Sequence, residues 1–258
     1  MTLSPDVSDA RPDISVVICF HNEDFVAGWT LDCVQRMRTY AQAKGFQIEL
    51  ICVLDRADPI TSKIVSGHGC ISPMDRVIWV NNGDPGSSRN DGVAIAQGEF
   101  IAIIDGDDYC SENWLAEAGK AAQSETQHVI FHPDYVVSFG ENYTVTRIND
   151  MRRQVCDLRN CFTTHPWVST AFGKRQAFLS HPYHPTDVRR TGFGYEDWEW
   201  NLRIVAAGYL HLSVTDTALF YRRKPLSVLT VENDYNAVVR PNPFFDAAFQ
   251  RRLQSASE

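Results

Sequence analysis

Short apolar runs alternate with longer amphipathic stretches through the first half of the chain. The run ISVVICF at residues 14–20 is continuous and rich in β-branched residues, which is typical of a strand covered on both faces of a sheet. Later runs of the same kind end at Asp55 and at Asp105. The pattern predicts strands at residues 14–20, 48–54, 77–80 and 100–104.

A stretch with helical spacing follows each of these runs. In the first, apolar residues recur at roughly helical spacing from Val26 to Tyr40, with Asn22 or Asp24 positioned to cap its start and Gly45 its end. The other predicted helices are residues 59–65, 88–97 and 114–122. Strand–helix alternation of this kind predicts a mostly parallel, doubly wound sheet.

Polar residues follow the predicted strands at the point where each strand ends. They are His21, Asp55, Asn81 and Asp105. In open parallel sheets, ligands bind beyond the carboxyl ends of the strands. These residues are therefore the first indication of a binding site at one edge of the sheet.

The second half of the chain has a less regular pattern. Residues 129–146 indicate two strands with a turn at residues 140–142, and the segment 165–184 contains a strand or helix that the pattern does not place. A helix is predicted at residues 196–207, between Gly194 and Gly208. The remaining predicted elements are short strands at residues 209–214 and 218–221 and a final helix at residues 241–253.

Composition narrows the class of protein. With 258 residues, 44% of them hydrophobic and 22% charged, the chain has ordinary globular usage and is long enough for one α/β domain. The formal net charge is -8, and the one basic cluster, Arg222-Arg223-Lys224, is short. Nucleic acid is therefore not expected as a partner.

Cysteine usage and hydropathy bear on the compartment. The chain has seven cysteines, scattered and without a CxxC pair, which favours a reducing compartment over a disulfide framework or a zinc site. No apolar run approaches the length of a membrane span, and the start of the chain lacks a signal-peptide pattern. These features predict a cytoplasmic protein, with peripheral attachment to a membrane left open.

An acidic motif follows the strand predicted at residues 100–104. Asp105, Asp107 and Asp108 stand in the sequence DGDD, where the glycine permits a sharp turn. Clustered carboxylates repel one another, and a divalent cation that prefers hard oxygen ligands compensates their charge. The alternative is a solvated acidic turn.

A second acidic motif opens the helix predicted at residues 196–207. Glu196 and Asp197 follow a glycine-rich loop, and acids at a helix N-terminus are favourable in any case. The alternative to helix capping is a carboxylate base at the rim of the sheet. Adjacent helical residues point about 100° apart, so that only one of the two is expected to face a substrate.

Two nucleotide-binding motifs are absent from the sequence. The segment GSSRNDG at residues 86–92 lacks the Gly-Lys-Ser/Thr ending of a phosphate-binding P-loop. No G-x-G-x-x-G follows the first predicted strand, which argues against a dinucleotide-dependent enzyme.

Taken in order, the motifs resemble those of the family 2 glycosyltransferases. The order is a strand followed by HNE, a strand ending in Asp, SSRNDGVAIAQGEFIAIIDGDD, and later GYEDWEWNLRIVAAG, and the resemblance covers residues 13–230. It implies the GT-A fold, an α/β fold with a Rossmann-like, doubly wound, mostly parallel sheet and a small antiparallel acceptor-side portion. It also implies a single domain over residues 1–258, with a nucleotide-binding half at 13–110, an acceptor-binding half at 111–240, and a C-terminal helix or linker at 241–258.

The resemblance assigns the nucleotide to the ends of the first two strands. His21, Asn22 and Glu23 match the loop that wraps the nucleotide, and Asp55 matches the acid that reads the edge of the base. The donor is then a UDP-sugar or a dTDP-sugar.

The resemblance assigns the sugar and the diphosphate to the next motifs. Arg89 and Asn90 match the pair that packs under the donor, and Asp105 matches the first acid of the D-x-D, which faces ribose or sugar. Asp107 matches the acid that binds Mg²⁺ or Mn²⁺.

The resemblance assigns catalysis to Glu196 and Asp197. Asp197 matches the base of an inverting enzyme, and Glu196 is a neighbour expected to contact the acceptor. Asp197 would take the proton from an acceptor hydroxyl, whose oxygen attacks the anomeric carbon opposite the diphosphate. A metal on Asp107 would stabilise the charge that builds on the leaving diphosphate.

The chain departs from the family at the end of the last strand predicted at 218–221. Many relatives have a metal-binding histidine there, but this chain reads FYRRKPLS at residues 220–227. Arg222, Arg223 or Lys224 could contact the diphosphate instead, and of these Arg222 or Arg223 is favoured because guanidinium suits phosphate. The alternative is a solvated basic turn, and His211, within a predicted strand, is expected to be structural.

Two other functions remain open from the sequence. The missing histidine favours a non-catalytic module of the same fold that binds a sugar or a partner protein. A nucleotidyltransferase also uses carboxylates and a metal, although residues 21–23 do not form the glycine-rich loop expected of one. The acceptor implied by the family is a saccharide or glycolipid of a bacterial surface polysaccharide, and residues after 241 could lead to a further domain of a longer protein.

Overall fold

A nine-stranded mixed sheet organises the part of the chain that the structure describes, residues 11–153 and 158–255 of a computed structural model. The strand order is β3-β2-β1-β4-β8-β6-β10-β5, and β7 pairs with β6 off this path. The strands of this sheet are β1 Ile14–Phe20, β2 Ile48–Asp55, β3 Arg76–Val80, β4 Phe100–Asp105, β5 Tyr109–Cys110, β6 Val129–Gly140, β7 Thr144–Arg147, β8 Ala171–Lys174 and β10 Leu210–Arg223.

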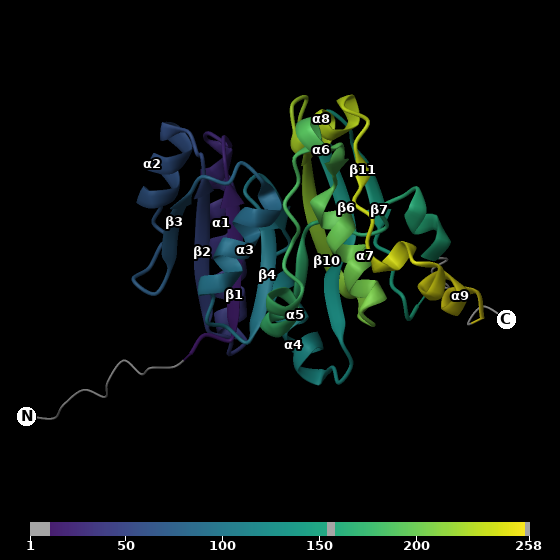
Figure 1. Ribbon diagram of the computed structural model, residues 1–258. Helices are drawn as coiled ribbons and strands as arrows, with labels where there is room; N and C mark the ends of the chain where they lie inside the picture. The colour runs from purple at the N-terminus through teal and green to yellow at the C-terminus, as the bar shows by residue number, and fades with distance from the viewer. Residues whose placement is uncertain (1–10, 154–157, 256–258) are drawn as a thin grey trace, which may run out of the picture.

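The sheet is mostly parallel in its first half and mixed in its second. Strands β3, β2, β1 and β4 are all parallel, and β6 is parallel to β10. Strand β8 lies antiparallel between β4 and β6, while β5 and β7 pair antiparallel with β10 and β6. Figure 1 shows β1 to β4 in the purple-to-blue half of the molecule and β6, β7 and β10 in the other half. The predicted parallel sheet with an antiparallel portion is confirmed.

Helices cover both faces of the sheet because the side chains of β1 alternate between two core clusters. Val16 and Ile18 face the cluster that includes α1 and α4, whereas Val17 faces the cluster that includes α3 and α5. The helices are α1 Val26–Ala43, α2 Pro59–Gly67, α3 Pro85–Ile95, α4 Trp114–Ser124, α5 Arg175–Ser180, α6 Val188–Thr191, α7 Glu196–Ala206, α8 Val228–Asp234 and α9 Ala247–Ser255. Short 3₁₀ helices lie at Leu158–Phe162 and Pro243–Phe245, and a separate two-stranded sheet joins β9 Phe193–Gly194 to β11 Val238–Val239.

One predicted helix cap and one predicted helix start were wrong. Helix α1 starts after Phe25 without a side-chain cap, because the Asn22 amide oxygen instead accepts from Asp58 N and Asp24 has a φ of 53°. Helix α3 starts at Pro85, three residues before the predicted start, because Asp84 caps it by accepting from Ser87 N. Proline suits the first turn of a helix, where its missing N–H leaves nothing unpaired.

The second half also differs from the expected elements. Residues 209–214 and 218–221 do not form two strands but the single long strand β10, whose register shifts between Val214 and Ala218. The segment that the pattern left unplaced contains β8 and α5. The expected final helix is shorter, because a 3₁₀ turn precedes α9.

Two further observations concern cysteines and membrane spans. The six described cysteines are free thiols, and Cys156 lies outside the described residues. Within the described ranges, every helix is too short or too polar to cross a bilayer.

Candidate functional site

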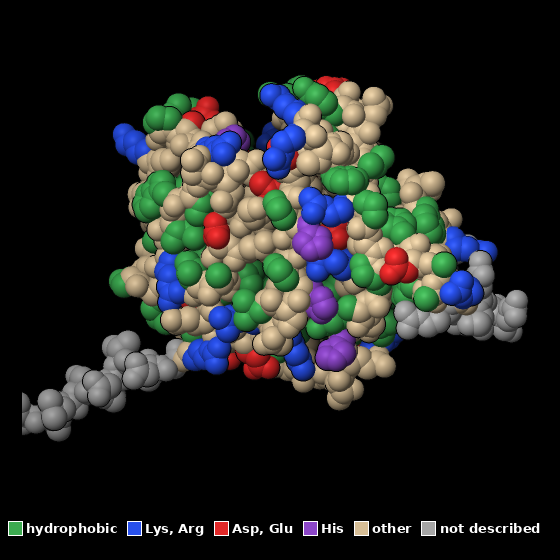
Figure 2. Space-filling view, in the orientation of Figure 1, with side chains coloured by type: hydrophobic (Ala, Val, Ile, Leu, Met, Phe, Trp, Pro, Cys, Tyr) green, Lys and Arg blue, Asp and Glu red, His purple; other side chains and the backbone are tan. Residues whose placement is uncertain are grey.

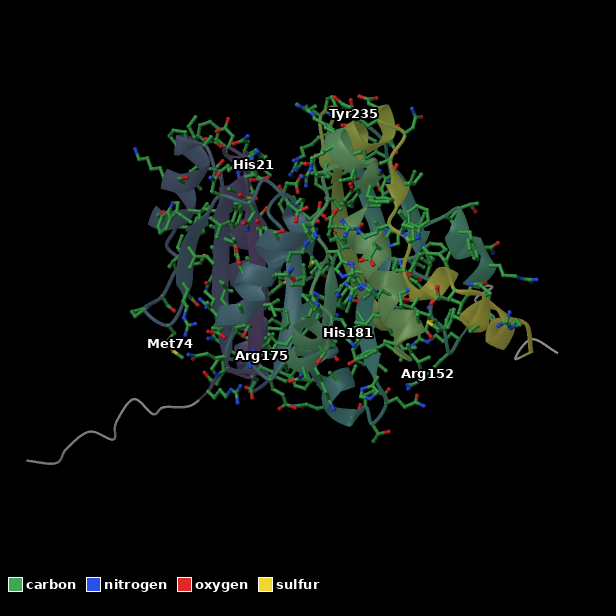
Figure 3. The ribbon with its side chains drawn as sticks, in the orientation of Figure 1. His21, Met74, Arg152, Arg175, His181 and Tyr235 are labelled. Atoms are coloured by element: carbon green, nitrogen blue, oxygen red, sulfur yellow. The ribbon has the colours of Figure 1, made fainter. Side chains whose placement is uncertain are left out.

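The carboxyl ends of β1, β2 and β4 meet at one edge of the sheet. The parallel register sets Cys19 beside Asp105, and the His21 ring nitrogen Nδ1 lies 2.6 Å from the Asp55 backbone oxygen. Figure 3 shows His21 at the upper end of β1, on the side that faces Tyr235 beyond α8. Figure 2 shows a notch between these two parts of the molecule, with Lys and Arg side chains on the wall near α8.

Asp55 is buried at this edge and orders the loop after β3. Its carboxylate accepts from the backbone N–H groups of Asn82, Gly83 and Asp84 at 2.8–3.2 Å and from the Ser88 hydroxyl at 2.9 Å. Backbone donors of this kind satisfy a buried carboxylate without a counter-ion. Asp55 therefore joins β2 to the start of α3, and its predicted contact with the base stays a prediction.

Arg89 connects the first half of the chain to the second half. From α3, its buried guanidinium donates to Asp105 Oδ1 at 2.9 Å and to Glu196 Oε1 at 2.6 Å. Ser169 donates to the other Asp105 oxygen at 2.6 Å. Asp105 ends β4 and Glu196 begins α7, so one side chain bridges the two acidic motifs that the sequence singled out.

Arg89 binds two carboxylates, Asp105 and Glu196, whose pKa values are shifted in opposite directions. Burial alone would raise the pKa of Asp105, but the Arg89 charge and the Ser169 hydrogen bond outweigh it and lower that pKa. For Glu196, burial together with the neighbouring Asp197 charge outweighs Arg89 and raises the pKa to about 7. The shared guanidinium therefore favours an ionised Asp105 more than an ionised Glu196.

Asn90, next to Arg89, is occupied by backbone contacts. Its side-chain nitrogen donates to the Tyr183 backbone oxygen at 2.8 Å, and its side-chain oxygen accepts from Tyr183 N at 2.9 Å. The Tyr183 ring in turn lies 5.4 Å from the Arg89 guanidinium carbon. Asn90 thus positions the segment after α5 against Arg89, and its predicted contact with the donor is untested.

The acidic turn after β4 places its three carboxylates in different surroundings. Asp107 Oδ2 lies 2.6 Å from Lys224 Nζ, at the end of β10. Asp108 is buried and accepts from Arg222 N at 2.8 Å; burial, followed by the charges of Asp107 and Asp105, raises its pKa well above the usual range. Asp107 is therefore the carboxylate of the turn that remains available to a cation.

The loop after β1 is part of the same charged region. Burial raises the pKa of Glu23 to about 7, with a further contribution from the charge of Asp107, although a hydrogen bond from the His21 backbone opposes the change. The Lys224 ammonium is influenced by both Asp107 and Glu23, and its pKa is raised because those charges outweigh its burial. Glu23 and Asp107, predicted as nucleotide and metal residues, thus lie close enough to interact.

Of the three basic residues at the end of β10 and directly after it, Lys224 contacts an acidic side chain of the turn. Arg222 donates to the Asp107 backbone oxygen at 3.2 Å, and its guanidinium lies over the rings of Phe139 and Tyr109. Arg223 lies over the Tyr221 ring, with its guanidinium carbon 4.7 Å from the ring centre. The predicted diphosphate contact of Arg222 or Arg223 stays a prediction, and the ion pair with an acid belongs to Lys224.

Asp107 is the residue of the acidic turn that could hold a divalent cation, and its role as a metal ligand stays a prediction. No set of three or more His, Cys, Asp or Glu side chains in residues 11–153 and 158–255 forms a cage for a metal. Asp105 is engaged by Arg89 and Ser169, which leaves the Asp107 carboxylate, already paired with a cationic group. A single carboxylate suits Mg²⁺ or Mn²⁺ when phosphate oxygens supply further ligands.

Asp197 is the second residue of α7, and Tyr195, whose backbone is left-handed, directly precedes the helix. Tyr195 has a φ of 55°, and its N–H donates to the buried Glu232 carboxylate of α8 at 2.6 Å. Asp197 Oδ1 accepts from Trp198 N at 2.7 Å, while Oδ2 lies 3.8 Å from His165 Nδ1. Burial is the main reason that the pKa of Asp197 is raised. Glu196 and Asp197 therefore point to different partners, as their helical spacing predicts.

Three residues of the site were missed by the sequence analysis: His165, Ser169 and Glu232. His165 and Ser169 belong to the segment that had no recognisable period, and Glu232 lies 37 residues after the Tyr195 backbone that it holds. A short capping signal, Ser227 with Thr230, marks the start of α8 but says nothing of the direction of Glu232. His211 is buried beside His132 and the Trp167 ring, in keeping with the structural role expected of it.

Known proteins resemble this chain in sequence. The family model described as glycosyl transferase family 2 matches residues 15–183, more than half of the chain. Glycosyltransferase GlyG of Streptococcus pneumoniae is 24% identical over 237 residues, which cover 86% of this chain and 74% of that protein. Poly(ribitol-phosphate) beta-glucosyltransferase of Bacillus spizizenii is 33% identical over 107 residues, 40% of this chain and 16% of that one.

A solved structure shows the same fold. Staphylococcus aureus TarS 1-349, in complex with UDP-GlcNAc, superimposes with a TM-score of 0.64 at 16% identity over 94% of this chain and 66% of that chain. At this identity the likeness shows the fold alone, which is the α/β GT-A fold. The chain spans a third or less of several other curated relatives, including EpsH of Bacillus subtilis at 33%.

Proposed function

Because the chain belongs to glycosyl transferase family 2, we propose that it transfers a sugar from a nucleoside diphosphate sugar to a hydroxyl group of a saccharide or glycolipid. The observation that supports this most is the Asp105–Arg89–Glu196 bridge, which sets a donor-side acid and the ED pair on one guanidinium. A UDP-sugar is the first donor to test, since TarS is solved with UDP-GlcNAc and with UDP. A dTDP-sugar is the second.

Asp197 is the proposed base of an inverting transfer. It would accept the proton of the acceptor hydroxyl as that oxygen forms a bond to the anomeric carbon, and the bond from that carbon to the diphosphate breaks. Burial raises the pKa of Asp197, which makes the carboxylate a stronger base once it is ionised. Glu196 is held by Arg89 at 2.6 Å, which supports a positioning role for it beside Asp197.

Positive charge at the diphosphate would come from two sources. Family 2 glycosyltransferases generally use a divalent metal, and Asp107 is the residue that would hold one here. When bound, such an ion supplies positive charge to the leaving diphosphate. Lys224 lies against the same carboxylate and is placed to bind a phosphate oxygen once Asp107 has another partner.

The acceptor proposed is a bacterial surface polysaccharide or its glycolipid precursor. Relatives include the poly(ribitol-phosphate) beta-glucosyltransferase and a succinoglycan biosynthesis protein of Rhizobium meliloti, ExoO. The proposed site of action, in the cytoplasm at the inner face of the membrane, follows from that acceptor and remains a prediction.

Calorimetric titration tests the donor part of the proposal. UDP and dTDP would be titrated into wild type and Asp107→Ala, each with Mn²⁺ and with EDTA. We expect Mn²⁺-dependent binding in the wild type and its loss in Asp107→Ala. Asp216→Asn is the matched control, because Asp216 is exposed and its φ of 60° suits asparagine. Failure of the wild type to bind either nucleotide would overturn the donor assignment.

The second candidate is a sugar-binding module of the same fold without catalysis. The ion pair between Lys224 and Asp107 favours it, because the carboxylate expected to bind a metal already has a cationic partner. Metal-dependent release of UDP from a UDP-sugar would exclude this candidate. Binding of nucleotide without release, across UDP-GlcNAc and UDP-glucose, would support it.

A further inference from the structure

The geometry points to His165 as the positioning residue that orients the Asp197 carboxylate for proton transfer. This inference rests on the proposed function, in which Asp197 is the base. His165 lies in the loop before β8, and its Nδ1 atom is 3.8 Å from Asp197 Oδ2. Asp197 is the second residue of α7, and His165 precedes it by 32 residues in the sequence.

Asn201 decides which ring nitrogen of His165 bears the proton. Asn201 lies one turn after Asp197 on α7, and its side-chain nitrogen is 2.8 Å from His165 Nε2. An amide nitrogen can only donate, so Nε2 accepts and the proton of the neutral ring is on Nδ1. Nδ1 is the ring nitrogen that lies 3.8 Å from Asp197 Oδ2. The opposite amide orientation would put the Nδ1 lone pair against a carboxylate, which is repulsive.

The ring of His165 is held in place by its neighbours. It stacks on Trp198 with 5.7 Å between ring centres and 7° between planes, and Trp198 is itself anchored by donating to the Cys161 backbone oxygen at 3.1 Å. Burial lowers the pKa of His165 to about 3, which keeps the ring neutral at physiological pH. His165 therefore acts as a neutral hydrogen-bond donor and not as a counter-ion.

The loop that contains His165 contacts both ends of the reaction centre. Ser169, four residues later, donates to Asp105 at 2.6 Å. Between them Trp167 donates to the Asn149 backbone oxygen at 3.0 Å, which anchors the loop to the strand region of the acceptor half. A single segment thus orients Asp105 on the donor side and Asp197 on the acceptor side.

The 3.8 Å separation is longer than a hydrogen bond. Catalytic hydrogen bonds are often long in the substrate-free enzyme and shorten in the reactive complex. Because Trp198 N already binds Asp197 Oδ1, a contact from His165 to Oδ2 would fix the plane of the carboxylate. One lone pair of the base would then be aimed at the acceptor hydroxyl.

Several other groups act on Asp197, and the test has to separate them from His165. The Arg89 charge lowers its pKa, and the Asp105 charge raises it. Glu196 and Glu232 interact electrostatically with it, and so does Tyr183. A donor from His165 to the ionised carboxylate lowers the pKa of Asp197, so its removal raises that pKa.

Paired substitutions separate a positioning role from a purely structural one. In His165→Asn the amide nitrogen takes the place of Nδ1 and can still donate to Asp197, whereas in His165→Gln it takes the place of Nε2 and cannot. We expect Asn to keep turnover within about 5-fold, and Gln and Leu to lower kcat roughly 10-fold or more with KM nearly unchanged. His128→Asn is the control, because His128 is exposed and lies directly before β6.

The activity probe is release of UDP from UDP-GlcNAc and UDP-glucose, with Mn²⁺, by transfer to water. When kcat is measured as a function of pH, its acid limb should move to higher pH in His165→Gln and His165→Leu. It should stay in place in His165→Asn. Equal turnover and equal pH profiles for Asn, Gln and Leu would overturn the inference. Absence of UDP release by the wild type would count against the proposed function instead.

A second measurement does not depend on turnover. Long-range ¹H–¹⁵N spectra of the histidine rings report the tautomer directly, with His165 assigned by the loss of its signals in His165→Asn. We expect a neutral Nδ1–H tautomer at pH 7, and a change of the His165 signals, but not those of His128, in Asp197→Asn. An Nε2–H tautomer, a charged ring, or no response to Asp197→Asn would overturn the inference.

Discussion

The two halves of the molecule place their functional side chains by different means. In the proposed donor half, residues 13–110, parallel strands end in register, and Asp55 is held by groups 27 to 33 residues away in the chain. In the proposed acceptor half, residues 111–240, the side chains around Asp197 are placed by loops and by α8 instead. Glu196 binds Arg89 across 107 residues, and His165 meets Asn201 across 36.

In the acceptor half, the contacts that form the core are therefore largely different from those that form the site. Regular strand pairing in the donor half creates the core and the site edge together, so a change there is expected to affect stability and binding at once. Near α7 the site depends on a few polar contacts made by loops and by α8. Changes to these contacts are expected to alter catalysis more than folding.

The largest expected effect is that of Asp197→Asn. Removal of the base should lower turnover about 10²–10⁴-fold, because general-base assistance is typically of that size. Calorimetric affinity for UDP should stay within about 2-fold of the wild type, since the proposed nucleotide contacts lie in the donor half. Full turnover in Asp197→Asn would remove the base assignment, and Asp216→Asn controls for the loss of an acid.

Arg89→Met breaks the link between the halves. Methionine keeps much of the volume but leaves Asp105 and Glu196 as buried carboxylates without their counter-charge. The free energy of unfolding, measured in urea, should fall by about 3–5 kcal/mol. Arg36→Met, at an exposed pair with Glu112, should cost at most about 1 kcal/mol. Similar losses for the two variants would contradict the bridging role of Arg89.

Gly92→Ala tests how tightly the donor half is packed. An added Cβ would lie 2.4 Å from Val17 Cγ1, so helix α3 would have to move away from β1. Overpacking of this kind costs about 1–3 kcal/mol of unfolding free energy. Gly67→Ala is the control, because a Cβ there meets nothing within 4 Å. Equal stability of the two variants would show that the α3 contact is more tolerant than its geometry indicates.

A change in the pH dependence of stability is expected at Glu232. Burial, with the charge of Glu196, raises the pKa of Glu232 from 4.5 to about 8. The folded state therefore retains a proton that the unfolded state releases, and stability falls as pH rises from 4.5 towards 8. In Glu232→Gln this fall should be smaller, while the oxygen that accepts from Tyr195 N is kept.

Urea unfolding at pH 5 and pH 8 measures the difference. Asp234→Asn, an exposed acid on the same helix α8, should follow the wild type at both values. A pH dependence of Glu232→Gln that equals that of the wild type would show that Glu232 is ionised in the folded protein.

Sequence reasoning succeeded where hydrophobic period and motif order coincide. Strands β1, β2 and β4 and the start of α7 lie at or within a residue of their predicted positions, and Asp105 and Asp197 lie in the site region. It failed at the cap of α1 and at the start of α3, because several nearby polar residues could each supply a cap. Asp84 rather than residue 88 marks the start of α3, since the local hydrogen bond to Ser87 decides between them.

The structure also adds a contact that the sequence did not indicate. Guanidinium chemistry favoured Arg222 or Arg223 for the diphosphate, which stays a prediction, whereas the ion pair with Asp107 is made by Lys224, the residue after β10. Arg222 is instead held over two aromatic rings by the packing of β5 and β6 against β10. A list of residue types cannot show that an aromatic surface already occupies one of the candidates.

The sequence by itself determined the α/β class, the strand ends that form the site edge, and the two acidic motifs, because these depend on short-range period and on residue order. Only the tertiary structure decided that one guanidinium joins those motifs and that His165, Ser169 and Glu232 surround them. The physical reason is that hydrogen bonds require partners within about 3 Å and in the right direction. Such proximity between residues far apart in the chain arises when the whole sheet and its covering helices have packed.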